Sequence, residues 1–326
     1  MAEAAVRLDN VTKTFGDTVA VRSMDLEVPK GGLWGFIGPN GAGKTTTIRM
    51  IMSILFPDSG RVEVLGRASA LEAKDRIGYL PEERGLYKKM RVGSFLAYIA
   101  RLKGRDGDLK QTVRRWLERV DLADSERSRC EELSKGMQQK IQFVAAVIHE
   151  PELLILDEPF SGLDPVNMRL LRDLVLDEHR RGATILFSTH VMVQAEQLCD
   201  HVVMINRGDR VVDESLDWIQ RRVYPHTGEV EPLETDADPS RLADLDGVAH
   251  VERRGATWEV TLAEGADAVR TIPAMVACVP AARVELRRPT LEDVFVQLVT
   301  DGAAAAEEEA RLRAELRGDA GAGVAR

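Results

Sequence analysis

A glycine-rich loop near the amino terminus holds the residues best suited to chemistry. It reads Gly38-Pro39-Asn40-Gly41-Ala42-Gly43-Lys44-Thr45, between an apolar strand predicted at 33–37 and a helix predicted from Lys44 to about Phe56. Such a loop lets backbone N–H groups converge on phosphate oxygens, helped by the helix dipole. Lys44 would reach the β and γ phosphates, the Thr45 hydroxyl would bind Mg²⁺, and Thr46 would extend the phosphate contacts. The alternative, a chance glycine-rich turn, is disfavoured by the flanking strand and helix.

Two carboxylates, Asp157 and Glu158, follow a second apolar run at 153–156. The carboxyl ends of parallel strands are where an α/β sheet presents its site. Asp157 can hold Mg²⁺ through its water shell, and Glu158 can polarise the water that attacks a γ-phosphate and accept its proton. A pair that only caps a helix is the alternative, which the upstream phosphate loop disfavours.

A third feature is the string Glu132-Leu133-Ser134-Lys135-Gly136-Met137-Gln138-Gln139. Ser134 is the expected N-cap of a helix whose apolar positions run from Met137 to Ile148, so that the helix N-terminus faces an anion. Taken alone, the string could equally be an ordinary capped helix.

Together with the two sites above, this string resembles the signature sequence of the ATP-binding cassette (ABC) ATPases. The resemblance covers residues from about 6 to 213. Within it, 38–45 is similar to the Walker A motif and 153–158 to Walker B. Ser161-Gly162-Leu163-Asp164 resembles the D-loop, and Ser188-Thr189-His190 resembles the switch-histidine segment. All of these motifs stand in the family's order.

The resemblance implies an ATPase that uses ATP and Mg²⁺. It assigns catalysis to Glu158, His190 and Lys44, and the metal to Thr45, Asp157 and Glu82. Phe15 matches the aromatic residue that stacks on adenine, although a core phenylalanine is a competing interpretation. The nucleotide contacts implied by the family are Phe15, Gly38, Pro39, Asn40, Gly41, Ala42, Gly43, Lys44, Thr45, Thr46, Glu82, Ser134, Gly136 and Asp164. Ser134 and Gly136 would act on ATP held by a second subunit.

The sequence departs from the family pattern at two places. Lys135 and Met137 replace a glycine and a glutamine of the signature, and Lys135 adds a charge favourable to ATP but more bulk. Glu82 stands where the family usually has glutamine, so it can coordinate Mg²⁺ but adds negative charge, which Arg84 would partly neutralise. The string 78–87, with Pro289-Thr290-Leu291-Glu292-Asp293-Val294-Phe295, resembles sodium-extrusion-type and related exporter ATPases that carry a small C-terminal domain.

The elements around these motifs predict an α/β fold. Strands are expected at 6–8 and 19–21 around a turn at 15–17, two amphipathic helices within 91–122, and buried parallel strands at 153–156, 184–187 and 202–205. The sequence becomes acidic and contains prolines from about Val223 to Pro239, which predicts a domain boundary there. Beyond it we expect a hairpin at 248–252 and 258–262, a helix at 266–275, a strand at 283–286 and a helix at 291–299.

The predicted fold class is therefore an α/β P-loop NTPase of the ABC cassette type, with a mixed sheet core, an antiparallel β subdomain and a helical insertion, plus a small α+β C-terminal domain. The expected domains are a cassette at 1–222, with its helical subdomain at about 88–150, an α+β accessory domain at 223–300, and a charged helical or disordered tail at 301–326.

Composition limits the classes of function and partner that the chain can have. The 44 basic and 53 acidic residues of the 326 give a net charge of −9, which argues against a nucleic-acid partner. Three separated cysteines support neither disulfides nor zinc, and we expect no signal peptide. Apolar runs stop far short of 18 residues, so if this protein works at a membrane, another chain must span it. The resemblance implies that this other chain is a separate transmembrane permease. We expect a cytoplasmic subunit, peripheral on the inner face of the cell membrane and dimeric with itself or a paralogous cassette.

The main functional interpretation is the ATP-hydrolysing subunit of an ABC transporter, with export favoured by the string at 78–87. The alternative is a non-transport soluble ABC ATPase, for cluster assembly or, less favoured, for work on DNA or the ribosome. A GTPase or kinase would not explain the signature and the histidine together.

Overall fold

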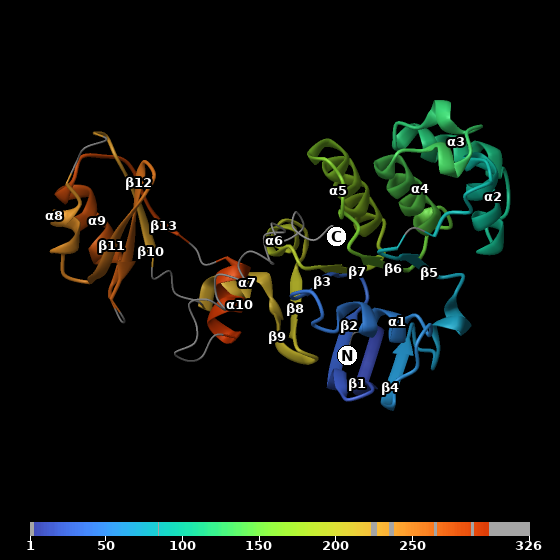
Figure 1. Cartoon of the computed structure of the whole chain (residues 1–326), viewed down its shortest axis with the longest axis horizontal. Coiled ribbons are helices and arrows are strands. Elements are labelled where there is room, and N and C mark those ends of the chain that lie inside the picture. The colour runs from blue at the N-terminus through green and yellow to red at the C-terminus, as the bar shows by residue number, and fades with distance from the viewer. Residues whose placement is uncertain are drawn as a thin grey trace. The chain divides into compact units, whose positions relative to one another are not determined.

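The computed structural model describes residues 3–83, 85–222, 227–234, 238–263, 266–287 and 290–299 (Figure 1). It divides into two compact units. The first contains the chain up to Leu216 together with the residues from Phe295, and the second contains Asp217–Val294. The expected contribution of Arg84 and the predicted tail at 301–326 lie outside the described residues.

A six-stranded sheet forms the centre of the first unit. Its order is β5-β6-β7-β3-β8-β9, parallel except for β9, which is antiparallel to β8. The strands are β3 (Leu33–Ile37), β5 (Ile77–Leu80), β6 (Leu153–Asp157), β7 (Thr184–Thr189), β8 (His201–Asn206) and β9 (Asp209–Ser215). Every residue of β3, β6 and β7 is buried, which confirms the parallel strands predicted from the apolar runs.

A three-stranded antiparallel sheet, of order β2-β1-β4, completes the β structure of this unit. Its strands are β1 (Ala4–Phe15), β2 (Thr18–Pro29) and β4 (Ser59–Val64). The hairpin predicted around residues 15–17 is confirmed, because Phe15 pairs with Thr18 across the turn. Side chains from both sheets and from α1 (Lys44–Ile51) share one apolar core.

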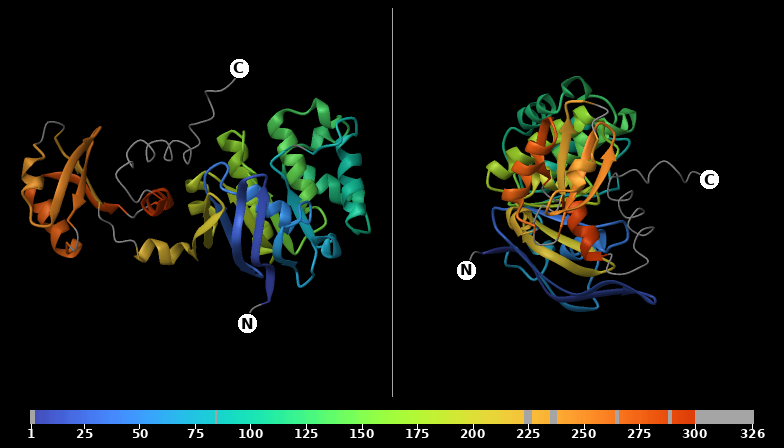
Figure 2. Two further views of the ribbon diagram at one scale, coloured as in Figure 1. Left: turned by 60° about the horizontal axis from the view of Figure 1, so that its bottom comes forward. Right: turned by 90° about the vertical axis from the view of Figure 1, so that its left-hand side faces the viewer.

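Some helices of the first unit contact the parallel sheet, and others pack on those helices. These helices are α1, α2 (Val92–Leu102), α3 (Leu109–Arg119), α4 (Lys135–Val147), α5 (Pro165–Arg180) and α6 (Met192–Leu198). Both α3 and α4 contact α2, and the three lie together, away from the β1–β2–β4 sheet (Figures 1 and 2). This group confirms the two amphipathic helices predicted within 91–122. The helices α7 (Leu216–Arg222) and α10 (Leu291–Val299) lie where the chain passes between the units.

The helix after the phosphate loop is shorter than predicted. Its apolar spacing suggested an end near Phe56, but α1 ends at Ile51. Ser53 adopts a left-handed backbone with φ 55°, and the next two N–H groups, of Ile54 and Leu55, donate back to the Arg49 carbonyl. These bonds satisfy carbonyls at the end of the helix and terminate it before Pro57 can.

The second unit is an antiparallel sheet of order β11-β12-β10-β13. The strands are β10 (Thr227–Pro232), β11 (Val248–Arg254), β12 (Thr257–Leu262) and β13 (Ala281–Arg287), with α8 (Ser240–Ala243) and α9 (Ala268–Cys278). Trp258, Val260 and Val230 form its core with Leu242 of α8 and Met275 of α9. The predicted hairpin, helix and strand are confirmed, and so is the helix at 291–299.

One strand of this unit contradicts the sequence-based expectation. Residues 227–232 were expected to belong to a polar boundary segment, yet β10 is an inner strand paired on both sides. Only Val230 points a large apolar side chain into the core, and it is fully buried. Glu229 and Glu231 lie on the other face, where each forms an ion pair with Arg283. Cross-strand ion pairs thus explain a strand whose composition resembles a loop.

Candidate functional site

The phosphate loop and Glu158 meet in one pocket of about 200 Å³, and Asp157 lies next to it, 3.5 Å from Thr45 Oγ1. Because β3, β6 and β7 are parallel, their carboxyl ends lie at one edge of the sheet, where the loop and both carboxylates follow. The lining residues are Ala20, Asn40, Gly41, Ala42, Gly43, Lys44, Thr45, Thr46, Glu82 and Glu158. All but Ala20 were predicted from the sequence to act on the nucleotide.

The loop geometry depends on glycine at two positions. Gly43 has φ 109°, and a β-carbon there would lie 2.4 Å from the Ala20 carbonyl oxygen. A β-carbon on Gly38 would lie 2.2 Å from the Ile205 carbonyl oxygen. Any side chain at either position would push the loop away from the strands that support it.

Lys44 lies inside this loop with only 6% of its surface exposed. Its Nζ donates to the carbonyl oxygens of Gly38 at 2.7 Å and of Pro39 at 3.1 Å. Burial lowers the pKa of Lys44, while the nearby carboxylates of Glu158 and Asp157 act in the opposite direction. The two hydrogen bonds to carbonyl oxygens hold the amino group of Lys44 inside the loop.

Asp157 has one satisfied and one free carboxylate oxygen. Its Oδ1 accepts from the Ser188 hydroxyl at 2.5 Å and lies 3.5 Å from Thr45 Oγ1. Its Oδ2 is buried and has no hydrogen-bond partner among the described residues. Burial is the main reason that the pKa of Asp157 is raised. A buried, unpartnered carboxylate oxygen beside a hydroxyl fits a hard divalent cation such as Mg²⁺.

Glu82 enters the same pocket from the loop after β5. Burial, followed by the charges of Asp157 and Glu158, raises its pKa. Among the residues that the structure describes, no three His, Cys, Asp or Glu side chains converge to form a metal cage. Mg²⁺ is usually held by one or two protein carboxylates together with water and phosphate oxygens, and Asp157 and Glu82 are the carboxylates that could serve it here.

Both carboxylate oxygens of Glu158 have close polar neighbours. Its Oε1 accepts from the backbone N–H of His190 at 2.9 Å and lies 2.7 Å from His190 Nδ1. The same oxygen lies 4.0 Å from Lys44 Nζ, and Oε2 lies 3.3 Å from Thr189 Oγ1. The backbone of Glu158 is left-handed, with φ 48°, a strained conformation for a non-glycine residue. The fold thus fixes this carboxylate beside the phosphate loop.

Six predicted nucleotide contacts lie outside the lining of this pocket. Two of them, Gly38 and Pro39, belong to the loop and accept from Lys44 through their carbonyl oxygens. Ser134 is the N-cap of α4, as predicted, and accepts from the Met137 N–H. Gly136 follows in the first turn of that helix. Asp164 is the N-cap of α5 and accepts from the N–H groups of residues 166 and 167, which lower its pKa. Phe15 ends β1 with half of its surface exposed.

Sequence reasoning gave no role to four residues that the structure brings to the site. Ala20 lines the pocket, Ser188 holds Asp157, Thr189 holds Glu158, and Gln194 lies 2.9 Å from the Thr189 hydroxyl. The parallel register places Ser188 beside Asp157. Polar residues at the end of a strand next to the acidic strand were therefore an available signal.

Comparisons with known proteins agree with this geometry. Residues 21–161 match the ABC transporter family model, and residues 215–299 match the model described as "ATP-binding protein DrrA1-3-like, C-terminal domain". An uncharacterised ABC transporter ATP-binding protein of Bacillus subtilis (strain 168) is 42% identical, over 90% of this chain and 97% of that protein. A Nod factor export ATP-binding protein of Cupriavidus metallidurans is 34% identical, over 90% and 97%.

A solved ATP-binding subunit of an ABC transporter has a TM-score of 0.61 and 28% identity, covering 67% of this chain and 92% of that one. The chain therefore belongs to the ABC transporter ATP-binding proteins, and its first unit has their cassette fold. No helix within the described residues has the length and apolarity needed to cross a membrane.

Proposed function

We propose that this chain hydrolyses ATP as the motor subunit of an ABC exporter. The observation that carries the proposal is the meeting of Lys44, Thr45, Asp157, Glu158 and His190 around one pocket at the carboxyl edge of the parallel sheet. Export is supported by the relative named for Nod factor export and by the DrrA-like second unit.

In the proposed reaction, Glu158 orients the attacking water and accepts its proton. Its carboxylate can do so because the backbone N–H and the ring of His190 hold Oε1, so that it need not reorganise when water binds. Lys44 and the backbone of the loop bind the β and γ phosphates. His190 would also contact the γ-phosphate.

Thr45 and Asp157 would hold Mg²⁺, and Glu82 is a further candidate. The ion, when bound, would supply positive charge that neutralises the phosphate oxygens. The hydroxyl of Ser188 leaves only Oδ2 of Asp157 free for this purpose.

We infer that ATP is enclosed between two cassettes. Ser134 and Gly136 lie at the N-terminus of α4, where the helix dipole and unpaired N–H groups favour an anion, yet they do not line this chain's own pocket. Asp164 likewise begins α5 outside the pocket. A second copy, or a paralogous cassette, would bring its α4 N-terminus to the γ-phosphate.

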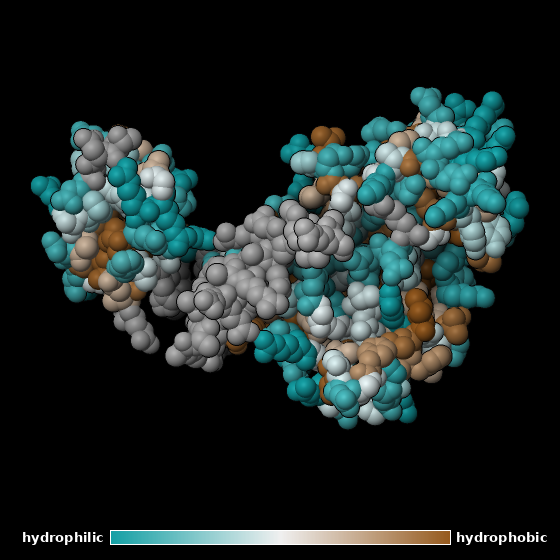
Figure 3. Space-filling view, in the orientation of Figure 1, coloured by the Kyte–Doolittle hydropathy of each residue, from teal (hydrophilic) through white to brown (hydrophobic). Residues whose placement is uncertain are grey.

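A permease would dock beside the segment that follows Pro81. Tyr87 is 53% exposed and Tyr98 is 44% exposed, and their rings meet edge to face. Apolar side chains also gather on the surface over α1 and the segment after it (Figure 3), where Ile54 and Phe56 are exposed. Exposed apolar residues grouped in this way are typical of a protein interface.

The proposal is tested by Glu158→Gln, which keeps the size of the side chain and removes its charge. We expect Mg-ATP binding to be retained and steady-state hydrolysis to fall by about a hundredfold or more, because the general base is lost. Equilibrium binding of labelled ATP and phosphate release are the two measurements. Hydrolysis at the full rate in this variant would show that Glu158 is not the base.

A separate experiment tests the transport role. The chain is co-expressed with a candidate permease from the same genome, and ATP hydrolysis by the purified complex is measured with candidate drugs and ions. Co-purification and stimulated hydrolysis are the expected results, whereas a chain that never associates with membranes would favour the soluble alternative.

A further inference from the structure

One hydroxyl proton is shared by two acceptors next to the proposed base. Thr189 Oγ1 lies 3.3 Å from Glu158 Oε2 and 2.9 Å from Gln194 Oε1, and it accepts from the Val191 N–H at 3.0 Å. A hydroxyl group has a single proton to donate. Thr189 can therefore donate either to Glu158 or to Gln194, but not to both at once.

The choice depends on the amide of Gln194. With its oxygen toward Thr189, the amide takes the hydroxyl proton and leaves Glu158 Oε2 without this donor. With its nitrogen toward Thr189, the amide donates to the hydroxyl, and the hydroxyl then donates to Glu158. The two orientations have almost the same shape, so the surrounding packing accommodates both.

The shared proton matters because the two carboxylate oxygens of Glu158 are held unequally. His190 holds Oε1 through its N–H and its ring, whereas Oε2 receives only the Thr189 hydroxyl among the described residues. Thr189 is fully buried and Glu158 is 7% exposed, so water does not readily replace a lost bond. Donation from Thr189 thus fixes the plane of the carboxylate.

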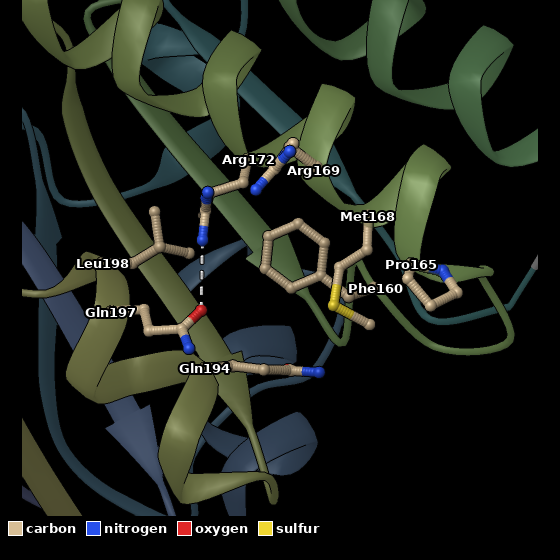
Figure 4. Close-up of a pocket in the computed structure, with 8 residues that line it drawn as sticks. All are labelled: Phe160, Pro165, Met168, Arg169, Arg172, Gln194, Gln197 and Leu198. Carbon is tan, nitrogen blue, oxygen red and sulfur yellow. Dashed lines mark hydrogen bonds between the residues drawn. The ribbon is translucent and has the colours of Figure 1, made fainter.

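Gln194 is also accessible from outside the ATP pocket. It lines a second cavity, of about 210 Å³, between α5 and α6 (Figure 4). There Gln194 and Gln197 reach in from α6 around the ring of Phe160, which is two residues beyond Glu158. Gln197 accepts instead from Arg172, at 3.1 Å. The two glutamines therefore share a cavity but differ in their contact with Thr189.

We propose that Thr189 and Gln194 are positioning residues for Glu158, and that the Gln194 amide decides whether the Thr189 hydroxyl holds the carboxylate in its hydrolytic orientation. The proposal rests on the role given to Glu158 above. It assigns no contact with ATP to either residue.

The test compares two substitutions of opposite hydrogen-bonding character. Gln194→Glu provides only acceptors, so it captures the Thr189 proton, and we expect kcat to fall about tenfold. Gln194→Met provides neither donor nor strong acceptor, so Thr189 donates to Glu158 in every molecule, and we expect kcat to rise by about two- to threefold. A role of Gln194 in packing alone predicts the reverse order, because glutamate is the closer replacement in shape.

Three further variants complete the experiment. Thr189→Val should lower kcat about tenfold with the Kd for ATP changed by less than about twofold, and Thr189→Ser should restore kcat. In the Thr189→Val background, Gln194→Met should lose its effect, since the proton that it redirects is gone. Gln197→Glu adds the same charge to the same cavity away from Thr189, and wild-type kcat is expected.

The outcomes separate this proposal from the proposed function. Equal losses in Gln194→Glu and Gln194→Met, full additivity in the double variant, or normal kcat in Thr189→Val would each overturn the positioning role. If Glu158→Gln abolishes hydrolysis while Thr189→Val does not affect it, only the positioning role fails. If Glu158→Gln hydrolyses ATP normally, both proposals fail.

Discussion

At the scale of single residues, the site depends on backbone shape and on the number of hydrogen-bond donors more than on net charge. The chain carries a net charge of −9, yet its proposed phosphate site combines backbone N–H groups, Lys44 and a helix N-terminus. Glu158 is aimed by a left-handed backbone and by donors that follow β7.

The glycines of the loop give the first prediction. Gly43→Ala should destabilise the protein by about 3 kcal/mol and weaken ATP binding, because the new methyl group meets the Ala20 carbonyl oxygen and φ is positive. Gly41→Ala is the matched control, since φ is 78° and nothing lies within 4 Å, so only about 1 kcal/mol is expected. Urea unfolding and ATP titration measure both effects, and equal losses would contradict the clash.

A buried histidine gives the second prediction. His149 Nε2 lies 3.1 Å from the Ile77 carbonyl oxygen, and its buried Nδ1 has no partner among the described residues. Burial, aided by Lys103, lowers the pKa of His149 to about 4. Between that value and the ordinary 6.5, the unfolded chain binds a proton at His149 that the folded chain does not bind. The free energy of unfolding is therefore unaffected by His149 above pH 6.5, and it falls as the pH drops from 6.5 toward 4.

The measurement is urea unfolding at pH 7.5 and at pH 5, for the wild type and for His149→Gln. The contribution specific to His149 should reach about 2 kcal/mol at pH 5, and it should be absent from the variant, which keeps an amide donor for the Ile77 carbonyl oxygen. The same loss in both proteins would assign the pH dependence to other groups.

At the scale of elements, the N-terminus of a helix is where an anion can be bound, and a cap residue shapes it. Ser134 caps α4 by accepting from Met137, and Asp108 caps α3 by accepting from Gln111. Each cap accepts from the N–H group three residues later, but only the α4 N-terminus is proposed to meet the ATP of a second subunit.

The third prediction compares these two caps. Ser134→Ala and Asp108→Ala should each cost about 1 kcal/mol of stability. Only Ser134→Ala should also weaken the ATP-dependent association of two chains, by about tenfold, as measured by analytical ultracentrifugation in the Glu158→Gln background. If both variants associate equally well, the α4 N-terminus does not contact the partner's nucleotide.

At the scale of the whole molecule, the two units have separate cores. Every residue that lines the proposed ATP pocket lies in the first unit, whereas Trp258, 2% exposed, lies in the core of the second. Each unit should therefore respond separately to a ligand or to a core defect.

The fourth prediction follows from these separate cores. Trp258→Ala should destabilise the second unit by about 4 kcal/mol and leave ATP binding intact. In calorimetry, Mg-ATP should raise the midpoint temperature of the first unit's unfolding transition only. Trp258→Ala should lower the midpoint temperature of the second unit's transition only. A single transition shifted by both would show that the units unfold together.

The sequence alone determined most of the local chemistry and most of the elements. The glycine-rich loop, the acidic pair and the apolar runs have short-range physical causes, such as phosphate-sized backbone loops and two-sided burial, and these can be read from neighbouring residues. Prediction from the sequence failed where tertiary contacts outweigh the preferences of neighbouring residues. Backbone pairing with β12 and β13, together with the ion pairs to Arg283, stabilises 227–232 as a strand, and the left-handed Ser53 ends α1 early.

Only the tertiary structure decided how the carboxylates are held. Asp157 and Ser188 are 31 residues apart in sequence, as are Glu158 and Thr189, and they meet because β6 and β7 are parallel and in register. The sharing of one Thr189 proton between Glu158 and Gln194 likewise depends on distances that no spacing of residues encodes. Hydrogen bonds are short and directional, so their partners are known only once the strands and helices have packed.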